Sequence, residues 1–383
     1  MNKSLIIDYV NILHYVAGYF DHLGVIDNAK SIIWRSVYYG VGDFEIYAPA
    51  NQNAVELLQP GFYVSRNDTD EIGLIDKIEI TDNDQDGRMI IATGKLIKNI
   101  LSYRHIYNLS GTSNKATTLR GNVEEAVRKV VSDNAINCAF DSKRNFNMLQ
   151  LGPLSNINLK IIDENGEAAA KQVSYDNLLT YTDLLLQEYG LGSKITFDEE
   201  SNMLNYIIYQ GKNRSMNNED GNNHVIFSEE FDNLLSSNYI LDISLEKNAV
   251  LIGGEGEGVN RFYTLLDDNK SGIYRKETFL DAGSISKTYK DEADADQTYT
   301  DDEYSSLLKM QAQQSKNSMI IIESLDGVID ATNGTFKYGE DFYNGDIVTI
   351  QDINLNLYIN VRIVEVVEVQ DDGGYTVQVK YQS

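Results

Sequence analysis

The sequence is poor in residues that cross-link a chain or bind transition metals. Its 383 residues include one cysteine, Cys138, and four histidines. A single cysteine cannot form a disulfide within the chain, so the fold does not depend on an oxidising compartment. The histidines have no ligand spacing with each other or with Cys138, which argues against a zinc site. They are His14, His22, His105 and His224.

Long apolar runs are also lacking. No stretch approaches the roughly 18 apolar residues of a membrane helix, so we expect no stable membrane anchor. The N-terminal segment is partly apolar, but Asp8, Asn11 and His14 interrupt it and no small-residue cleavage site follows. We therefore expect the protein to be made and folded in a cytoplasm.

Positive charge is scarce. The chain has 32 basic against 58 acidic residues, a formal net charge of −26. Such a chain repels phosphates, which argues against sequence-specific nucleic acid binding and against an anionic membrane surface. The apolar fraction of 42% is ordinary for a soluble globular protein.

Familiar catalytic motifs are missing as well. We find no G-x-S-x-G elbow, no Walker loop and no H-E-x-x-H pair. Cys138 could pair with a distant histidine, but its neighbours Asn137 and Ala139 give no local support, and we favour a small buried hydrophobe. We predict no enzyme activity and no catalytic, cofactor-binding or metal-binding residues.

Strand patterns dominate residues 1–115. The runs Leu23–Trp34 and Phe44–Pro49 are rich in β-branched and aromatic residues, and turn signals follow both. Asn51–Leu58 is predicted to be a short helix. Glu71–Thr81 and Arg88–Thr93 are predicted to form a hairpin.

The tip of that hairpin has two interpretations. Asp82, Asp84, Asp86 and Gly87 match the opening of a calcium loop. The twelfth position is Thr93, however, where such a loop needs a bidentate glutamate, and the flanks are strands. We favour a solvated turn, with cation binding as the alternative.

Residues 116–195 are partly helical. Asn122 and Glu125 have the spacing of a capping box ahead of an apolar helical face. Ser174 is expected to cap a second helix, and Gly190 with Gly192 can end it in a left-handed conformation. We predict an α/β insert with two helices.

The remaining sequence returns to strands. Residues 196–285 contain the strand-like runs Met203–Tyr209, His224–Phe227, Tyr239–Leu245 and Ala249–Ile252, with an exposed loop at Lys212–Asn223. Residues 286–316 are an acidic linker, mobile around Asp291–Asp302, followed by a short helix that Thr300 and Glu303 cap.

Residues 317–383 are β again. Ile347–Ile350 is a short apolar run, and Tyr358–Val369 is a long strand with a bulge predicted near Val366-Val367. Tyr375, Val377 and Val379 alternate with polar residues, as in a half-buried strand. No internal repeat of short period is visible.

The stretch Gly254–Gly258 resembles a phosphate-binding glycine loop. Phosphate loops present amides and usually a lysine to an anion, but here Glu255 and Glu257 lie inside the loop. The following segment Val259–Leu266 is strand-like, whereas a dinucleotide site requires a helix there. We favour a strand-to-strand connection over a nucleotide site.

At this stretch the chain resembles siphovirus tail hub proteins, also called tail-associated or baseplate hub proteins, of Gram-positive phages and prophages. The ordered matches include Gly24–Asp27, Ser31–Trp34, Gly42–Glu45, Leu57–Gly61, Gly94–Leu96, Phe227–Leu234, Asn248–Val250, Gly253–Gly258, Arg261, Ser271-Gly272, Arg275–Glu277, Phe279, Asp281, Glu303-Tyr304, Gly327–Asp330, Tyr338–Phe342 and Gly345–Val348. Asn213 departs from the pattern, where an aspartate is expected, and the first 20 residues match poorly.

The resemblance implies a mainly β, α+β multi-domain tail hub fold. It implies two β-barrel tube domains, at 1–115 and 196–285, with the helical insert 116–195 between them. The linker 286–316 and a small C-terminal β-barrel at 317–383 follow. A homotrimer would then present a pseudo-sixfold ring to the hexameric tail tube.

The implied location is the virion tail tip, with assembly in the host cytoplasm. Expected partners are the distal tail protein or tail tube hexamer, the tape measure protein, and receptor-binding or tip proteins; no cofactor is expected. We expect Arg261, Arg275 and Glu277 to make inter-strand or inter-subunit ion pairs. The alternatives are the hub of a contractile particle, either a myovirus-like phage or a tail-derived bacteriocin, and a cell-wall-polymer binding or hydrolysing tail protein.

Overall fold

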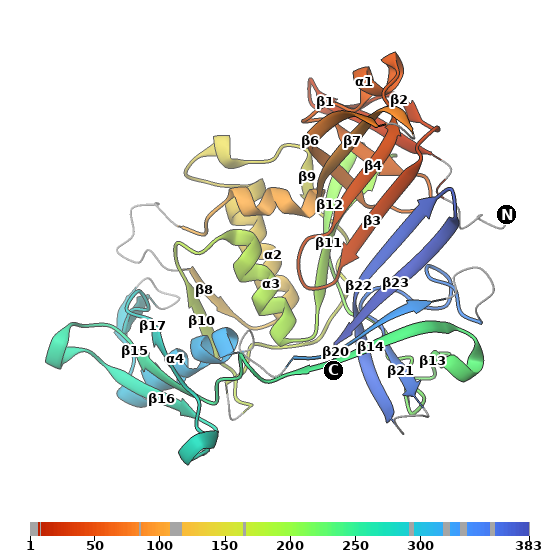
Figure 1. Ribbon diagram of the computed structural model, residues 1–383. Coiled ribbons are helices and arrows are strands. Elements are labelled where there is room, and N and C mark those ends of the chain that lie inside the picture. The colour runs from red at the N-terminus through yellow and green to blue at the C-terminus, as the bar shows by residue number, and fades with distance from the viewer. Residues whose placement is uncertain are drawn as a thin grey trace.

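One large sheet organises the molecule. The computed structural model describes residues 7, 9–83, 86–107, 117–163, 166–290, 295–316, 322–329, 335–352 and 357–382. Within them 13 strands form a single sheet, and the longer helices lie to one side of it (Figure 1). The predicted α+β, mainly β fold class is confirmed.

The N-terminal strands form one end of this sheet. They are β1 (Val10–Val16), β2 (Tyr19–Ile26), β3 (Ser31–Val37), β4 (Asp43–Pro49), β5 (Tyr63–Arg66), β6 (Ile72–Asn83) and β7 (Gly87–Leu96). Alternate residues point inward, so Ile32, Trp34, Phe44 and Ile46 share one core. The predicted β6–β7 hairpin is confirmed.

Two local predictions in this part differ in outcome. Helix α1 (Gln52–Leu57) confirms the expected short helix, and the Asn51 side chain caps it by accepting a hydrogen bond from Ala54 N at 2.8 Å. The expected single strand Leu23–Trp34 is wrong. The segment 27–30, with the polar residues Asp27, Asn28 and Lys30, breaks it, and β2 precedes and β3 follows that break in the sequence.

The C-terminal strands extend the same sheet. They are β13 (Ile226–Ser228), β14 (Leu234–Asp242), β20 (Ile322–Ile329), β21 (Ile347–Asp352), β22 (Leu357–Asp371) and β23 (Gly374–Gln382). β22 runs antiparallel to β3, from Glu365 opposite Val37 to Asp371 opposite Ser31. Strands from the N-terminal and C-terminal parts of the chain therefore lie side by side in one sheet (Figure 1).

The sheet consists of two similar halves. The strand order β14-β20-β23-β22 continues directly into β3-β4-β7-β6. Each half ends in a long hairpin, β22–β23 or β6–β7, and a short strand, β21 or β5, pairs with the start of that hairpin. These five strands of one half correspond to those of the other, which is a structural duplication of long period. The next strand differs, because β1 pairs antiparallel with β5 whereas β13 pairs parallel with β21.

The duplication extends to single hydrogen bonds. Gly61 N donates to Ile75 O at 2.9 Å, and Gly345 N donates to Ile363 O at 2.8 Å. A register shift follows at the same place in each hairpin, between Ile75 and Lys77 and between Ile363 and Glu365. The predicted bulge of the C-terminal strand is therefore confirmed. It lies between Ile363 and Glu365, slightly before Val366-Val367, because the alternation of apolar residues does not show where pairing slips.

Residues 117–209 form a partly helical unit beside the sheet. Its elements are β8 (Thr117–Arg120), α2 (Val123–Val131), β9 (Leu149–Leu151), β10 (Ala170–Val173), α3 (Leu178–Glu188), β11 (Gly192–Asp198) and β12 (Met203–Tyr209). Val127 and Val131 of α2 and Leu185 of α3 are fully buried in a shared core.

The first helix cap of this unit is as predicted and the second is not. Asn122 caps α2, accepting from Glu125 N at 3.1 Å. Asn177, not Ser174, caps α3 and accepts from Thr180 N at 3.2 Å. Residues 175–178 bond instead to residues 104–106, with Tyr175 N donating to Ile106 O at 2.6 Å. That pairing holds Ser174 outside the helix.

A smaller module is inserted between β14 and β20. It contains β15 (Ala249–Gly253), β16 (Tyr263–Asp267), β17 (Glu277–Asp281), β18 (Thr288–Lys290), β19 (Asp296–Thr298) and α4 (Asp301–Lys316). Val250 and Ile252 pack against Tyr304 and Leu308 of α4. The Thr300–Glu303 capping box is confirmed, with Thr300 N donating to Glu303 Oε2 at 2.8 Å.

Strand pairing crosses the predicted domain borders. β11 spans residue 195, and the strands of residues 196–285 belong to three sheets: that of the helical unit, the large sheet and the small module. The division into five segments stays a prediction. In the described ranges, no helix is both long and apolar enough to cross a membrane.

Candidate functional site

The glycine-rich stretch connects β15 to β16, as the sequence indicates. The Arg261 guanidinium lies across it, donating to Gly254 O at 3.1 Å and Gly253 O at 2.9 Å, and pairs with Asp281. Gly256 has φ +103°, and a Cβ there would lie 2.5 Å from Asn260 O. The glycines serve a tight strand connection.

Arg275 lies in the connection between β16 and β17, which flank β15 in the small sheet, and pairs with a residue of each strand. Its guanidinium lies 2.6 Å from Asp267 Oδ2, at the end of β16, and 2.6 Å from Glu277 Oε1, at the start of β17. The predicted inter-strand ion pairs of Arg261, Arg275 and Glu277 are therefore confirmed within one chain. A role for them between subunits stays a prediction.

Cys138 is a buried side chain, as expected. Its exposed fraction is 4%, and the nearest polar group in the hydrogen-bond network is Arg144 Nη1, 3.6 Å from Sγ. His105, the closest histidine in sequence, uses Nδ1 to contact Tyr175 O at 2.9 Å. The Cys138 thiol and the His105 ring thus contact different groups, although Arg144 also donates to the backbone oxygen of His105.

The Asp82–Asp86 turn is only partly described. Asp84 and Gln85 lie outside the described residues. Asp86 Oδ2 accepts a hydrogen bond from the Tyr47 hydroxyl at 3.1 Å. Within the described parts of the chain, no group of three or more His, Cys, Asp or Glu side chains is placed to hold a metal. Cation binding at this turn stays untested.

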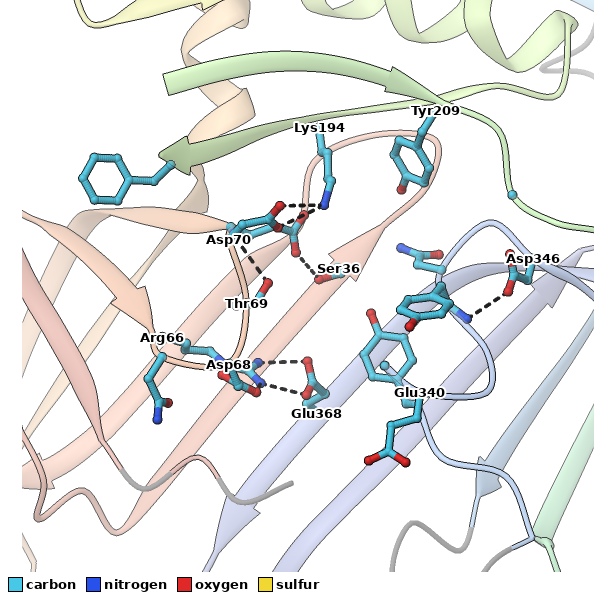
Figure 2. A pocket seen from close by; sticks show the side chains of 18 of the residues that line it. Ser36, Arg66, Asp68, Thr69, Asp70, Lys194, Tyr209, Glu340, Asp346 and Glu368 are labelled. Carbon is cyan, nitrogen blue, oxygen red and sulfur yellow. Dashed lines mark hydrogen bonds and ion pairs between the residues drawn. The ribbon is translucent and has the colours of Figure 1, made fainter. Parts of the chain in front are cut away.

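A cleft lies where the two halves of the large sheet meet the helical unit. Its volume is about 830 Å³. Residues 66–71, around the β5–β6 connection, form one side, and Lys194 of β11 with residues 209–212 after β12 forms the second (Figure 2). The segment 338–346 and Glu368 of β22 complete it. Three segments that are far apart in sequence therefore form the three walls of the cleft.

Arg66 is the central buried cation of the cleft. Its side chain is 1% exposed, and its guanidinium makes two 2.8 Å hydrogen bonds to Glu368 and an ion pair with Asp68. Burial lowers the pKa of the Arg66 guanidinium, but the two carboxylates outweigh it and raise that pKa. Tyr375 adds a hydroxyl donor to Glu368 at 2.7 Å. The carboxylate is thereby held by several donors.

Glu71 lies on the opposite wall. Burial raises the pKa of its carboxyl, although the 2.7 Å hydrogen bond from Ser36 and the charge of Lys194 act against the rise. Lys194 Nζ itself lies 3.0 Å from Asp70 Oδ1. Figure 2 shows these two contacts side by side.

The third wall contains a further buried ion pair. Asp346, 2% exposed, accepts from Arg214 Nε and from Lys212 N, each at 2.7 Å. Gly211 passes so close that a Cβ there would lie 1.8 Å from Gly345 O. The predicted exposed loop Lys212–Asn223 is therefore wrong at its start, because Arg214 and Ser215 are buried against the C-terminal half.

Several charged side chains at the cleft form ion pairs with one another. Arg66, Lys194 and Arg214, the partner of the lining residue Asp346, each face a carboxylate at hydrogen-bond distance, so these ion pairs connect the three segments. Sequence patterns missed this cluster. The one local signal is the polar run Asn67–Glu71 directly after a strand. Asp70 of this run meets Lys194, 124 residues away in sequence, and the adjacent Arg66 meets Glu368, 302 residues away.

The fold is that of prophage tail proteins. A tail protein from Neisseria meningitidis MC58 superimposes with a TM-score of 0.54 at 11% identity, over 98% of this chain and 96% of that chain. The 43 kDa tail protein of prophage MuSo2 from Shewanella oneidensis gives a TM-score of 0.53 at 12% identity, over 97% and 98% of the two chains. A search of curated proteins finds no match.

The sequence of the chain also identifies its family. Residues 13–381 match the family of siphovirus ReqiPepy6 Gp37-like proteins, and the chain belongs to that family. The resemblance to siphovirus tail proteins is confirmed over most of the chain. The protein is a component of a phage tail.

Proposed function

We propose that this chain is the structural hub at the distal end of a phage tail tube and acts as a homotrimeric ring. The observation that supports this most is the duplicated sheet, because β3-β4-β7-β6 and β14-β20-β23-β22 repeat one arrangement. Three subunits with two equivalent halves each present six equivalent sheets. Such a ring matches a hexameric tube while containing only three chains.

The two halves correspond to the two tube domains of this proposal. The first contains β1–β7, and the second contains β13, β14 and β20–β23, so the second is discontinuous in sequence. The helical unit of residues 117–209 lies between them in sequence. The module of β15–β19 and α4 is inserted into the second. This proposed division differs from the sequence-based one, which places borders at residues 195 and 285.

The charge of the chain suits a conduit. Three chains of −26 each give a ring of 3 × −26 = −78 formal charges. Negative walls do not retain DNA, because its phosphates are repelled. We propose that DNA and the tape measure protein pass through the ring, that the distal tail protein or tail tube hexamer binds one face, and that tip or receptor-binding proteins bind the other. The role is structural rather than enzymatic.

The mass of the purified chain in solution tests this proposal. We expect a species of three chains by light scattering at tens of micromolar, and rings in negatively stained micrographs. A stable monomer with no ring at that concentration contradicts the trimer. Turnover of purified cell wall by this chain alone contradicts the non-enzymatic role.

A further inference from the structure

Two long strand edges of the large sheet have no partner among the described residues. Lys77–Asn83 of β6 pair with β7 on one side alone, and β14 pairs with β20 alone. Unpaired backbone amides and carbonyls at such edges are templates for another strand. Apolar side chains accompany them, since Ile80 is 39%, Ile240 41% and Leu241 57% exposed.

The duplication shows what pairs with these edges. β22 corresponds to β6 and β3 corresponds to β14, and β22 pairs with β3 inside the chain. The equivalent contact, β6 with β14, is absent within one chain, because these strands stand at the two ends of the eight-stranded array. Seven strand spacings separate them, roughly 34 Å. A second copy of the chain can supply the missing partner.

Equivalent residues follow from the rows of paired strands. Ile78, Ala92, Ile46 and Ile32 lie opposite one another across β6, β7, β4 and β3. Val366, Val379, Gly327 and Ser237 form the corresponding row across β22, β23, β20 and β14. Ile78 is therefore equivalent to Val366, and Ile32 to Ser237.

We propose that β6 of one copy pairs antiparallel with β14 of the next, with Ile78 opposite Leu241. This rests on the proposed trimer and adds its register. Inside the chain Val366 lies opposite Ser36, four residues beyond Ile32. The same step beyond Ser237 reaches Leu241. Lys77 then lies opposite Asp242, and Glu79 lies opposite Ile240.

The chemistry of the paired positions agrees with this register. Ile78 and the exposed Leu241 bring two apolar side chains together, and Lys77 opposite Asp242 brings together opposite charges. The register shift between Ile75 and Lys77 allows one further hydrogen bond between the two copies. Tyr38 N donates to Val364 O at 2.8 Å within the chain, so Ile243 N is the equivalent donor to Asp76 O of the next copy. Three such contacts close a ring of 24 strands.

Paired cysteines test the register. In the full chain carrying both Glu79→Cys and Ile240→Cys, oxidation should give covalent dimers and a closed covalent trimer on a denaturing gel. Directly opposite residues have Cα atoms about 4.5–5.5 Å apart, which a disulfide spans. A disulfide within one copy is excluded by the distance between the two edges.

The matched control shifts the pair by one residue. Glu79→Cys with Leu241→Cys places the two sulfurs on opposite faces of the sheet, so we expect no covalent trimer. Each single variant is also expected to give none, since Cys138 is buried. A non-covalent trimer without cross-linking of the first pair overturns the register and leaves the proposed function standing. A chain that stays monomeric overturns both, and cross-linked species beyond three chains overturn the closed ring.

Discussion

At the scale of single residues, the cleft shows how buried charge is tolerated. Arg66 and Glu368 are both nearly inaccessible, and each is held by a second partner, Asp68 for the cation and Tyr375 for the carboxylate. Breaking a buried pair leaves an uncompensated charge, which costs about 3–5 kcal/mol, whereas the intact pair contributes little net stability. The network joins the two halves of the sheet, because Arg66 belongs to β5 and Glu368 to β22.

Glu71 has no such cation at hydrogen-bond distance. Burial raises the pKa of its carboxyl in the folded state above that in the unfolded state. The stability that the protonated Glu71 carboxyl contributes is fully present at pH values below its pKa in the unfolded chain. It is lost as the pH rises through the pKa of this carboxyl in the folded chain. Glu71→Gln keeps an acceptor for the Ser36 hydroxyl, so we expect a higher free energy of unfolding than the native chain at neutral pH, and no difference in acid. Urea unfolding at both pH values measures this.

Glu340, an exposed side chain at the same cleft, supplies the matched control. Glu340→Gln should leave the unfolding free energy within about 0.5 kcal/mol of the native value, as surface substitutions usually do. A lower stability for Glu71→Gln at neutral pH would show that the charged carboxylate stabilises the cleft, contrary to this account.

At the scale of elements, capping residues in the sequence predict the helix starts correctly where no distant segment bonds to the same stretch of backbone. Asn51 and Asn122, and Thr300 with Glu303, cap the predicted helices, because a cap needs only backbone groups two or three residues away. Ser174 carries the same kind of signal and fails. Pairing of the neighbouring segment with residues 104–106 decides the start of α3 instead.

The α3 cap gives a direct comparison of two substitutions. Asn177→Ala removes the acceptor for Thr180 N and a 2.6 Å hydrogen bond to Ser102 O, so it should lower the unfolding free energy by about 1–2 kcal/mol. Ser174→Ala should change it by less than about 0.5 kcal/mol, since Ser174 lies outside the helix. Chemical denaturation of the two variants decides between the caps; equal losses would contradict the assignment.

At the scale of the whole molecule, the edges of the sheet control assembly. Leu241→Asp places a carboxylate at the proposed contact with Ile78, and we expect the trimer to dissociate at concentrations where the native chain is trimeric. Leu23→Asp is the matched control, because Leu23 is 39% exposed on β2, the edge at the other end of the sheet. It should leave the mass in solution unchanged. Light scattering on both variants measures this, and the reverse pattern would place the subunit contact at β2.

The sequence by itself determined the β-rich class, the hairpins, most helix caps and the strand-to-strand nature of the glycine stretch. These features depend on neighbours within a few residues, whose dihedral preferences and alternation are visible in the chain. Only the tertiary structure decided that β22 joins β3, that Arg66 meets Glu368, and that the two halves repeat. Pairing between segments some 300 residues apart depends on register and burial, which no local pattern encodes.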